Sequence, residues 1–246
     1  MANPKGFILD RFASPIDGAP CVAIMTTKST NRKTGDMMQV WIMRDDVNPV
    51  EAVNEGDDFS ICGNCPHRKN SFTQKRSCYV NVGQGPNAVW KAYKAGKYAE
   101  DFTWNDRHIL KGRHIRWGAY GDPAIINPQI FNAINSLAAG HTGYTHQWKE
   151  KFAQVYKGDF MASVDNYLDK QLASAHGWKT FHVAPVGEIG QGVKCPATVE
   201  NSMAQCITCR LCDGVKKDVW VEAHGAGKRH VGAMMTESTR ERSHHA

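Results

Sequence analysis

The sequence has no long apolar run, which argues against a helical membrane protein. No segment of its 246 residues approaches the roughly 18 to 20 apolar residues that a membrane-spanning helix needs. The N-terminal stretch Met1-Ala2-Asn3-Pro4-Lys5-Gly6 also lacks the apolar core of a secretory signal peptide. We therefore expect a cytoplasmic protein that has no membrane partner.

The chain also lacks a strong charge bias. Its formal net charge of +6 is modest for this length, so contact with nucleic acid or another anion is permitted but not required. A glycine-rich turn at residues 81–86 precedes an expected helix over residues 87–94. This turn has neither the Walker pattern nor the preceding strand of a dinucleotide fingerprint, which argues against a phosphate-binding loop of either kind.

The eight cysteines are interpreted as free thiols, because disulfides are rare in a reducing cytosol. Cys21 stands alone beside the apolar residues 22–25, and we expect it to be a small buried side chain rather than a ligand. The other seven fall into a first thiol group and a second thiol group. The first group is Cys62, Cys65 and Cys78, and the second is Cys195, Cys206, Cys209 and Cys212.

The first thiol group predicts a metal centre with an open coordination position. Cys62 and Cys65 belong to the loop Cys62-Gly63-Asn64-Cys65-Pro66-His67-Arg68, and Cys78 follows Cys65 after twelve intervening residues. No fourth cysteine lies nearby in the sequence. Structural zinc sites usually fill all four positions with protein ligands, whereas catalytic metals keep one position for water or substrate.

The second thiol group is the more specific metal signal. Its four thiols lie within eighteen residues and can satisfy either a zinc ion or a complete iron–sulfur cluster. The run Cys206-x2-Cys209-x2-Cys212 favours iron–sulfur, because zinc ribbons more often use two separated pairs, yet zinc remains an alternative. Pro196 and Gly214 allow the tight turns that such a site needs. The group could also be purely structural and fasten the end of the chain through metal-coupled folding.

Hydrophobic patterns predict strands that alternate with helices, which is typical of a parallel sheet or a βα barrel. In such folds the loops after the strands gather at one end, so residues 121–123, 145–148 and 165–166 are expected to meet there. Each of these loops taken alone could equally be a polar turn. Expected strands cover residues 21–25, 40–43, 113–118, 141–146, 160–164, 179–184 and 218–223, and expected helices cover residues 87–94, 128–139, 149–156 and 167–175.

Together with the first thiol group, two later motifs make residues 60–190 resemble a divergent radical S-adenosylmethionine (SAM) protein, and more narrowly small uncharacterised phage and prophage proteins. The usual family signature is C-x3-C-x2-C, whereas the spacing here is C-x2-C-x12-C. The stretch Gly118-Ala119-Tyr120-Gly121-Asp122-Pro123 is similar to the GGEP motif that holds the amino group of SAM, with aspartate in place of glutamate. Met161-Ala162-Ser163-Val164-Asp165-Asn166 resembles the family strand that ends in Ser-x-Asp.

This resemblance implies a partial (β/α) barrel of radical SAM type with a C-terminal cysteine-rich metal-binding extension. It implies one or two [4Fe-4S] clusters and SAM as cofactors, with Gly121, Asp122, Ser163 and Asp165 at the SAM site. A cubane held by three thiolates leaves one iron free to chelate SAM, and an electron from an external donor then cleaves SAM to a 5′-deoxyadenosyl radical. By analogy with phage proteins, the substrate would be a nucleotide or a nucleic acid, and the site of action the host cytoplasm.

Two other functions remain open. The first is a zinc protein that binds or modifies nucleic acid, with the first thiol group completed by His67 or a distant histidine. The second is an iron–sulfur module without SAM chemistry. The aromatic residues at the expected strand ends could line a pocket or simply pack; these are Trp117, Tyr120, Tyr144, His146 and Trp148. The expected organisation is N-terminal strands over residues 1–60, a barrel core over 61–190, a cysteine-rich extension with the last strand over 191–235, and a flexible tail over 236–246.

Overall fold

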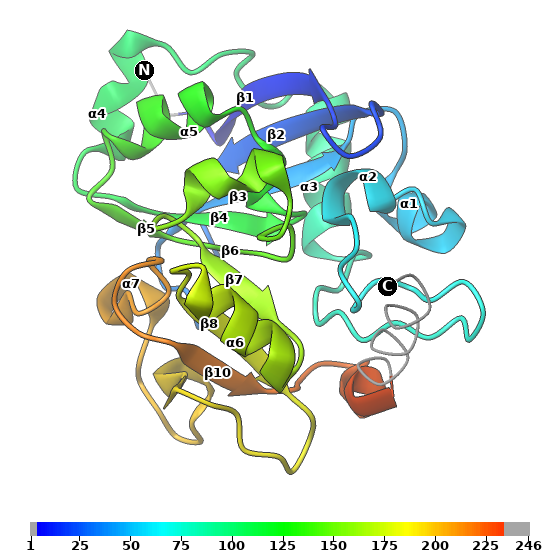
Figure 1. Cartoon of the computed structure of the whole chain (residues 1–246). Coiled ribbons are helices and arrows are strands. Elements are labelled where there is room, and N and C mark those ends of the chain that lie inside the picture. Colours follow the sequence, from blue (N-terminus) through cyan, green and yellow to red (C-terminus); the bar gives the residue numbers. More distant parts are fainter. Residues whose placement is uncertain (1–3, 234–246) are drawn as a thin grey trace.

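A computed structural model describes residues 4–233, which form a mixed α/β structure built on two five-stranded sheets (Figure 1). The strand order is β1-β2-β3-β4-β5 in the first sheet and β6-β7-β8-β10-β9 in the second. The expected tail over residues 236–246 lies outside the described residues. The strands are β1 (Gly6–Ala13), β2 (Pro20–Thr26), β3 (Met38–Arg44), β4 (His114–Tyr120), β5 (Gly140–Thr142), β6 (Tyr144–Thr145), β7 (Met161–Val164), β8 (Thr180–Ala184), β9 (Val193–Lys194) and β10 (Val219–Glu222).

The strand directions confirm the α/β class that the sequence predicts. Strands β1, β2 and β3 are antiparallel, so the strands expected over residues 21–25 and 40–43 are neighbours in one sheet, and β3, β4 and β5 are parallel. All pairs in the second sheet are parallel. The two sheets are not closed into a barrel, because the first ends on the antiparallel strand β1 and the second on the two-residue strand β9.

A single residue separates the two sheets. The expected strand over residues 141–146 is wrong as one element, because the chain leaves the first sheet after Thr142 and enters the second at Tyr144. Between them, the Gly143 amide donates to the carbonyl of Cys212 at 3.1 Å, outside both sheets. A Cβ atom on Gly143 would lie 2.6 Å from the Phe160 ring, so this crossing requires glycine.

The helices are short and flank the sheets. The expected helix over residues 167–175 is confirmed, with the Asn166 side chain capping it by accepting from the Asp169 amide at 2.8 Å. This helix, α6, covers one face of the second sheet (Figure 1). The α-helices are α1 (Pro49–Glu55), α2 (Phe59–Cys62), α3 (Gly85–Lys94), α4 (Arg107–Leu110), α5 (Pro128–Asn135), α6 (Tyr167–Ala175) and α7 (Cys206–Cys209). None of the helices within residues 4–233 has the length and apolarity needed to cross a membrane.

The α-helix expected over residues 149–156 is wrong: the segment Lys151–Tyr156 forms a 3₁₀ helix. Its hydrogen bonds explain the difference. The carbonyl of Glu150 accepts from the Ala153 amide at 3.1 Å and from the Gln154 side chain at 3.1 Å. An α-helix would instead pair this carbonyl with the Gln154 backbone amide, so the Gln154 side chain competes with the α-helical pattern.

The main core lies on the first sheet. Strands β2 and β3 are buried along almost their whole length, which is typical of inner strands covered on both faces. Cys21 is only 1% exposed within this core, as expected for a small apolar side chain. Strand β3 pairs with β4, and β10 lies between β8 and β9, so the N-terminal strands and the cysteine-rich segment are both built into the sheets. Strands β1 and β9 were not predicted from the sequence.

Candidate metal centres

Both thiol groups line one cavity of about 370 Å³. The cavity lies where parallel strands end: Asp122 follows β4, His146 follows β6, Asp165 follows β7 and Cys195 follows β9. The three loops that the sequence predicts at one end do meet, because the Asp122 carboxylate accepts from the His146 amide at 2.8 Å and His146 lies 3.4 Å from Asp165. Carboxyl ends of parallel strands are where α/β folds usually place their chemistry.

The first thiol group is held by a compact loop after α2. The Cys65 amide donates to the Cys62 carbonyl at 3.2 Å, and the Cys78 amide donates to the His67 carbonyl at 2.9 Å. Arg68, at the end of this loop, donates to the carboxylate of Asp58 at the start of α2 at 2.7 Å and so ties the loop to this helix. These bonds join the two separated parts of the C-x2-C-x12-C pattern, so the long spacing still brings all three thiols to the same cavity.

The same loop is anchored to the strand ends. The Gln147 side chain donates to the Cys62 carbonyl at 2.8 Å, and the Asp122 amide donates to the Ile61 carbonyl at 2.7 Å. Gly63 has φ 52° and ψ −134°, a conformation that residues with a side chain rarely adopt. Its Cβ position lies 2.4 Å from the Gln147 amide oxygen, so glycine is required at this contact.

The second thiol group is assembled from distant parts of the chain. The Cys195 amide donates to the Trp220 carbonyl of β10 at 2.8 Å. The Cys206 amide donates to the carbonyl of Lys33 at 2.9 Å, so the turn between β2 and β3 packs on the cysteine-rich segment. The Cys212 carbonyl accepts from the amide of Gly143 at the junction of the two sheets. The group is therefore integral to the fold.

Burial and mutual proximity make the thiolate forms of both groups costly. Burial, followed by the charges of Asp58, Cys65 and Cys78, raises the pKa of Cys62. In the second group burial is again the largest cause, and neighbouring cysteines further raise the pKa of Cys212. Clustered, desolvated thiols of this kind become stable thiolates when a metal cation supplies the compensating charge.

The distances between the thiols can be compared with those of a single zinc site. Tetrahedral zinc with bonds of about 2.3 Å brings its sulfur ligands to roughly 3.8 Å from one another. Within residues 4–233, no three cysteine sulfur atoms lie within 4.8 Å of one another. A cubane cluster spreads its cysteine ligands over a larger tetrahedron, because each thiolate binds a different iron. Within the described residues, neither thiol group is therefore arranged as three ligands of one zinc ion.

Three of the four residues expected at the SAM site line the cavity: Gly121, Asp122 and Ser163. Gly121 has φ 75° and its Cβ position lies 2.6 Å from the Ile42 carbonyl oxygen, so only glycine fits there. The two Asp122 oxygens accept from the amides of Ala124 at 3.0 Å and His146 at 2.8 Å. Each carboxylate oxygen has a further lone pair, so Asp122 keeps acceptor capacity.

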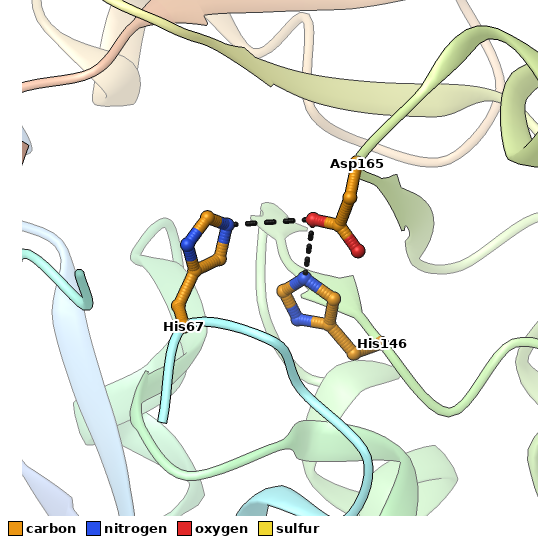
Figure 2. Close-up of side chains that lie close together, drawn as sticks. All are labelled: His67, His146 and Asp165. Atoms are coloured by element: carbon orange, nitrogen blue, oxygen red, sulfur yellow. Dashed lines mark hydrogen bonds and ion pairs between the residues drawn. The ribbon is translucent and has the colours of Figure 1, made fainter. Parts of the chain in front are cut away.

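The fourth residue, Asp165, lies between two histidines (Figure 2). Its Oδ1 atom is 3.4 Å from His67 Nε2 and 3.4 Å from His146 Nε2. Burial opposes the charge of this carboxylate, but the two histidines lower the pKa of Asp165 far below its usual range. His146 Nε2 also lies 3.9 Å from the Cys65 sulfur atom, which connects this cluster to the first thiol group.

Between the two thiol groups, the cavity wall carries a cation. The Arg116 guanidinium donates to the hydroxyl groups of Tyr79 and Tyr144, and Tyr144 stacks on Phe181 with ring centroids 4.4 Å apart. No carboxylate within residues 4–233 forms an ion pair with Arg116. Burial acts to lower the pKa of Arg116, but its interactions with Tyr144, Tyr79 and Cys206 raise this pKa above its usual range.

Sequence reasoning placed the aromatic residues only in part and missed Arg116. Tyr120, Tyr144 and His146 line the cavity, whereas Trp117 and Trp148 are buried in hydrophobic cores. A charged residue inside an expected inner strand was the signal that could have identified Arg116, because such a residue needs a specific environment. The pairing of His67 with His146 joins positions 79 residues apart and carried no local signal.

No family model, curated protein or solved structure matches this chain.

Proposed function

We propose that this chain is an iron–sulfur enzyme of radical SAM type, with SAM bound at the first thiol group. The observation that carries the proposal is the convergence of two thiol groups, one of three and one of four cysteines, on a single cavity. A three-thiol group leaves a coordination position for a small molecule, whereas a four-thiol group can close its centre. In this proposal the substrate lies between the two.

The arrangement of parallel strands supports a partial barrel of radical SAM type. The run β3-β4-β5 in the first sheet and β6-β7-β8-β10-β9 in the second is parallel throughout. The two runs meet at Gly143, and the loops after β4, β6, β7 and β9 reach the same cavity or its border. A partial barrel of this type would need the two parallel runs to lie side by side around the cavity, and their junction at Gly143 is the contact that supports this.

Within this proposal, Asp122 and Ser163 orient SAM. Asp122 accepts two backbone N–H bonds that hold it rigidly, and its remaining lone pairs are available to the SAM amino group. Ser163 is 3% exposed and sits at the end of β7, on the cavity wall. When bound, a reduced cluster supplies the electron that cleaves SAM to a 5′-deoxyadenosyl radical. Phe181 and Val221 give this part of the cavity an apolar wall.

The partly buried cation Arg116 favours an anionic substrate. Arg116 forms no ion pair with a carboxylate of residues 4–233, and a ligand phosphate or carboxylate could supply that charge-assisted partner. Arg116 lies between the two thiol groups, and Tyr79 and Tyr144 fix its guanidinium. A nucleotide or a nucleic-acid phosphate is consistent with this charge.

The test is an analysis of protein purified without oxygen. We expect iron and acid-labile sulfide in equal amounts, a brown colour, an electron paramagnetic resonance (EPR) signal that SAM changes, and formation of 5′-deoxyadenosine. Colourless protein with zinc and no sulfide would exclude this proposal and favour the zinc alternative. Brown protein whose EPR signal SAM does not change, and which forms no 5′-deoxyadenosine, would exclude this proposal and favour an iron–sulfur module without SAM chemistry.

A matched pair of cysteine variants assigns the two centres. Cys78→Ala should abolish SAM cleavage and lower the iron content by about half, because the second thiol group keeps its cluster. Cys21→Ala is the control, since Cys21 is buried in β2 and does not line the cavity, so its loss should leave the iron content unchanged. Full SAM cleavage by Cys78→Ala would refute the assignment of the first thiol group.

A further inference from the structure

We propose that His67, His146 and Asp165 form a third metal site, which binds one first-row divalent cation. Figure 2 shows both imidazole rings directed at the same carboxylate oxygen. The three ligand atoms lie within 4.8 Å of one another, closer together than any three thiols in residues 4–233. The site uses none of the seven cysteines of the two thiol groups as ligands, although His146 lies 3.9 Å from the Cys65 sulfur atom.

The distances in this cluster match ligands of a common ion and are long for hydrogen bonds, although the contact from His146 to Asp165 meets a loose hydrogen-bond criterion. His67 Nε2 and His146 Nε2 each lie 3.4 Å from Asp165 Oδ1. Hydrogen bonds between an imidazolium and a carboxylate are shorter, about 2.7 to 2.9 Å. Two ligands of a tetrahedral ion with bonds of about 2.1 Å are instead separated by about 3.4 Å. A cation between the three atoms therefore accounts for both separations.

His67 supplies the second, independent observation. It is 7% exposed, and its Nε2 atom has no hydrogen-bond partner although it is buried. The other ring nitrogen, Nδ1, lies 2.8 Å from the Ser77 hydroxyl oxygen. When Nδ1 donates to Ser77, the Nε2 lone pair faces the Asp165 carboxylate, and a cation between the two atoms favours this tautomer. An outer hydrogen bond of this kind is typical of metal-binding histidines.

The three ligands come from three loops that other contacts hold in place. The His67 carbonyl accepts from the Cys78 amide, and the His146 amide donates to the Asp122 carboxylate. Asp165 lies between the end of β7 and the capping residue Asn166 of α6. The backbone on either side of the cluster is therefore fixed before any ion binds, and preorganisation of this kind favours metal binding.

Two imidazoles and one carboxylate select iron(II), manganese(II), cobalt(II) or zinc(II), and leave coordination positions open. His67 and His146 line the cavity, whereas Asp165 is 6% exposed behind them. The open positions therefore face the cavity. They would take water or an oxygen anion of the substrate, on the side of the cavity next to Cys65.

Manganese(II) is the probe for this site, because it prefers oxygen and nitrogen ligands to thiolates. The full-length protein, purified without oxygen and freed of labile divalent ions, would be titrated while the EPR signal of free manganese(II) is followed. We expect one equivalent to bind. His67→Gln and Asp165→Asn should each weaken binding more than tenfold, and Ser77→Ala should weaken it about tenfold through the outer hydrogen bond.

His141→Gln is the matched control. His141 is similarly buried, and its Nε2 atom lies 2.8 Å from the Asp159 carbonyl oxygen, but no second histidine shares its partner. This variant should bind manganese(II) like the unaltered protein. No bound manganese(II), or equal binding by His67→Gln and the unaltered protein, would overturn the proposal.

A measurement on the unaltered protein keeps the test independent of variant folding. Pulsed EPR of the bound manganese(II) should show nitrogen couplings from two imidazoles, and their absence would overturn the proposal. The outcome is also distinct from that of the proposed function. Manganese(II) bound by two imidazoles in a protein without SAM cleavage would leave the third site in place, and SAM cleavage without such binding would remove only the third site.

Discussion

Gly63 offers a direct test of how the first thiol group is positioned. The backbone of this residue, at φ 52° and ψ −134°, lies outside the regions open to residues with a side chain. A Cβ atom would come within 2.4 Å of the Gln147 amide oxygen, and Gln147 is only 3% exposed. Gly63→Ala must therefore strain the backbone, displace Gln147, or do both.

The expected cost follows from these two effects. Backbone strain at such a position costs about 1 to 3 kcal/mol. Displacement of Gln147 removes its 2.8 Å hydrogen bond to the Cys62 carbonyl, which contributes about 0.5 to 1.5 kcal/mol. We predict that Gly63→Ala lowers the free energy of unfolding by about 3 kcal/mol. Because Gln147 anchors the loop beside Cys62, the variant should also lose iron from the first thiol group.

Gly56→Ala is the matched control. Gly56 also has a positive φ, 90°, but its Cβ position has no heavy atom within 4 Å. Only the intrinsic cost of the left-handed conformation, about 1 kcal/mol, should appear there. Urea unfolding gives the two free energies, and iron analysis gives the occupancy of each centre. Equal unfolding free energies for the two variants, or equal iron contents, would refute this account of the loop.

Three other perturbations separate the roles of the two thiol groups and their scaffold. Cys209→Ala should remove the metal from the second thiol group and lower the yield of soluble protein, while the first thiol group keeps its iron. An unchanged metal content would contradict this prediction. Asp122→Ala should lower the free energy of unfolding by about 2 to 4 kcal/mol, because the amides of Ala124 and His146 lose their acceptor. Asp122→Asn should recover part of that loss in urea unfolding, and equal effects of the two variants would argue against the hydrogen bonds. Removal of iron by a chelator should lower the melting temperature in calorimetry, since metal binding stabilises the folded chain by mass action, and an unchanged temperature would contradict metal-coupled folding.

The sequence predicted the helices and strands that have strong local patterns. Its predictions failed for elements whose limits are set by contacts with distant parts of the chain. Helix α6 was predicted with its correct limits, because Asn166 is a good capping residue and Gly177 follows the helix. The strand expected over residues 141–146 was divided by a backbone bond from Gly143 to Cys212, and no local pattern encodes a partner 69 residues away. Strand β9 has two exposed residues, so it carries no hydrophobic signal.

The candidate site was predictable to the extent that its residues follow strands. The rule that loops gather at the carboxyl ends of parallel strands brought residues 121–123, 145–148 and 165–166 together correctly. That rule places these residues at one edge of the sheet, but it does not give the distances between their side chains. It could not show that His67 and His146 share one oxygen of Asp165, because His67 comes from the cysteine loop rather than from a strand end.

The contacts of the second thiol group show that it is not a metal-binding loop that folds independently of the two sheets. The amides of Cys206 and Ile207 donate to the carbonyls of Lys33 and Thr34, and the Gln205 side chain donates to the carbonyl of Arg32. These bonds join the turn between β2 and β3 to a segment more than 170 residues later, and β9 and β10 tie the same segment to the second sheet. A metal bound there would therefore stabilise the contact between the two sheets as well as its own loop. The cavity between the thiol groups is bounded by both sheets, so its shape depends on the same contact.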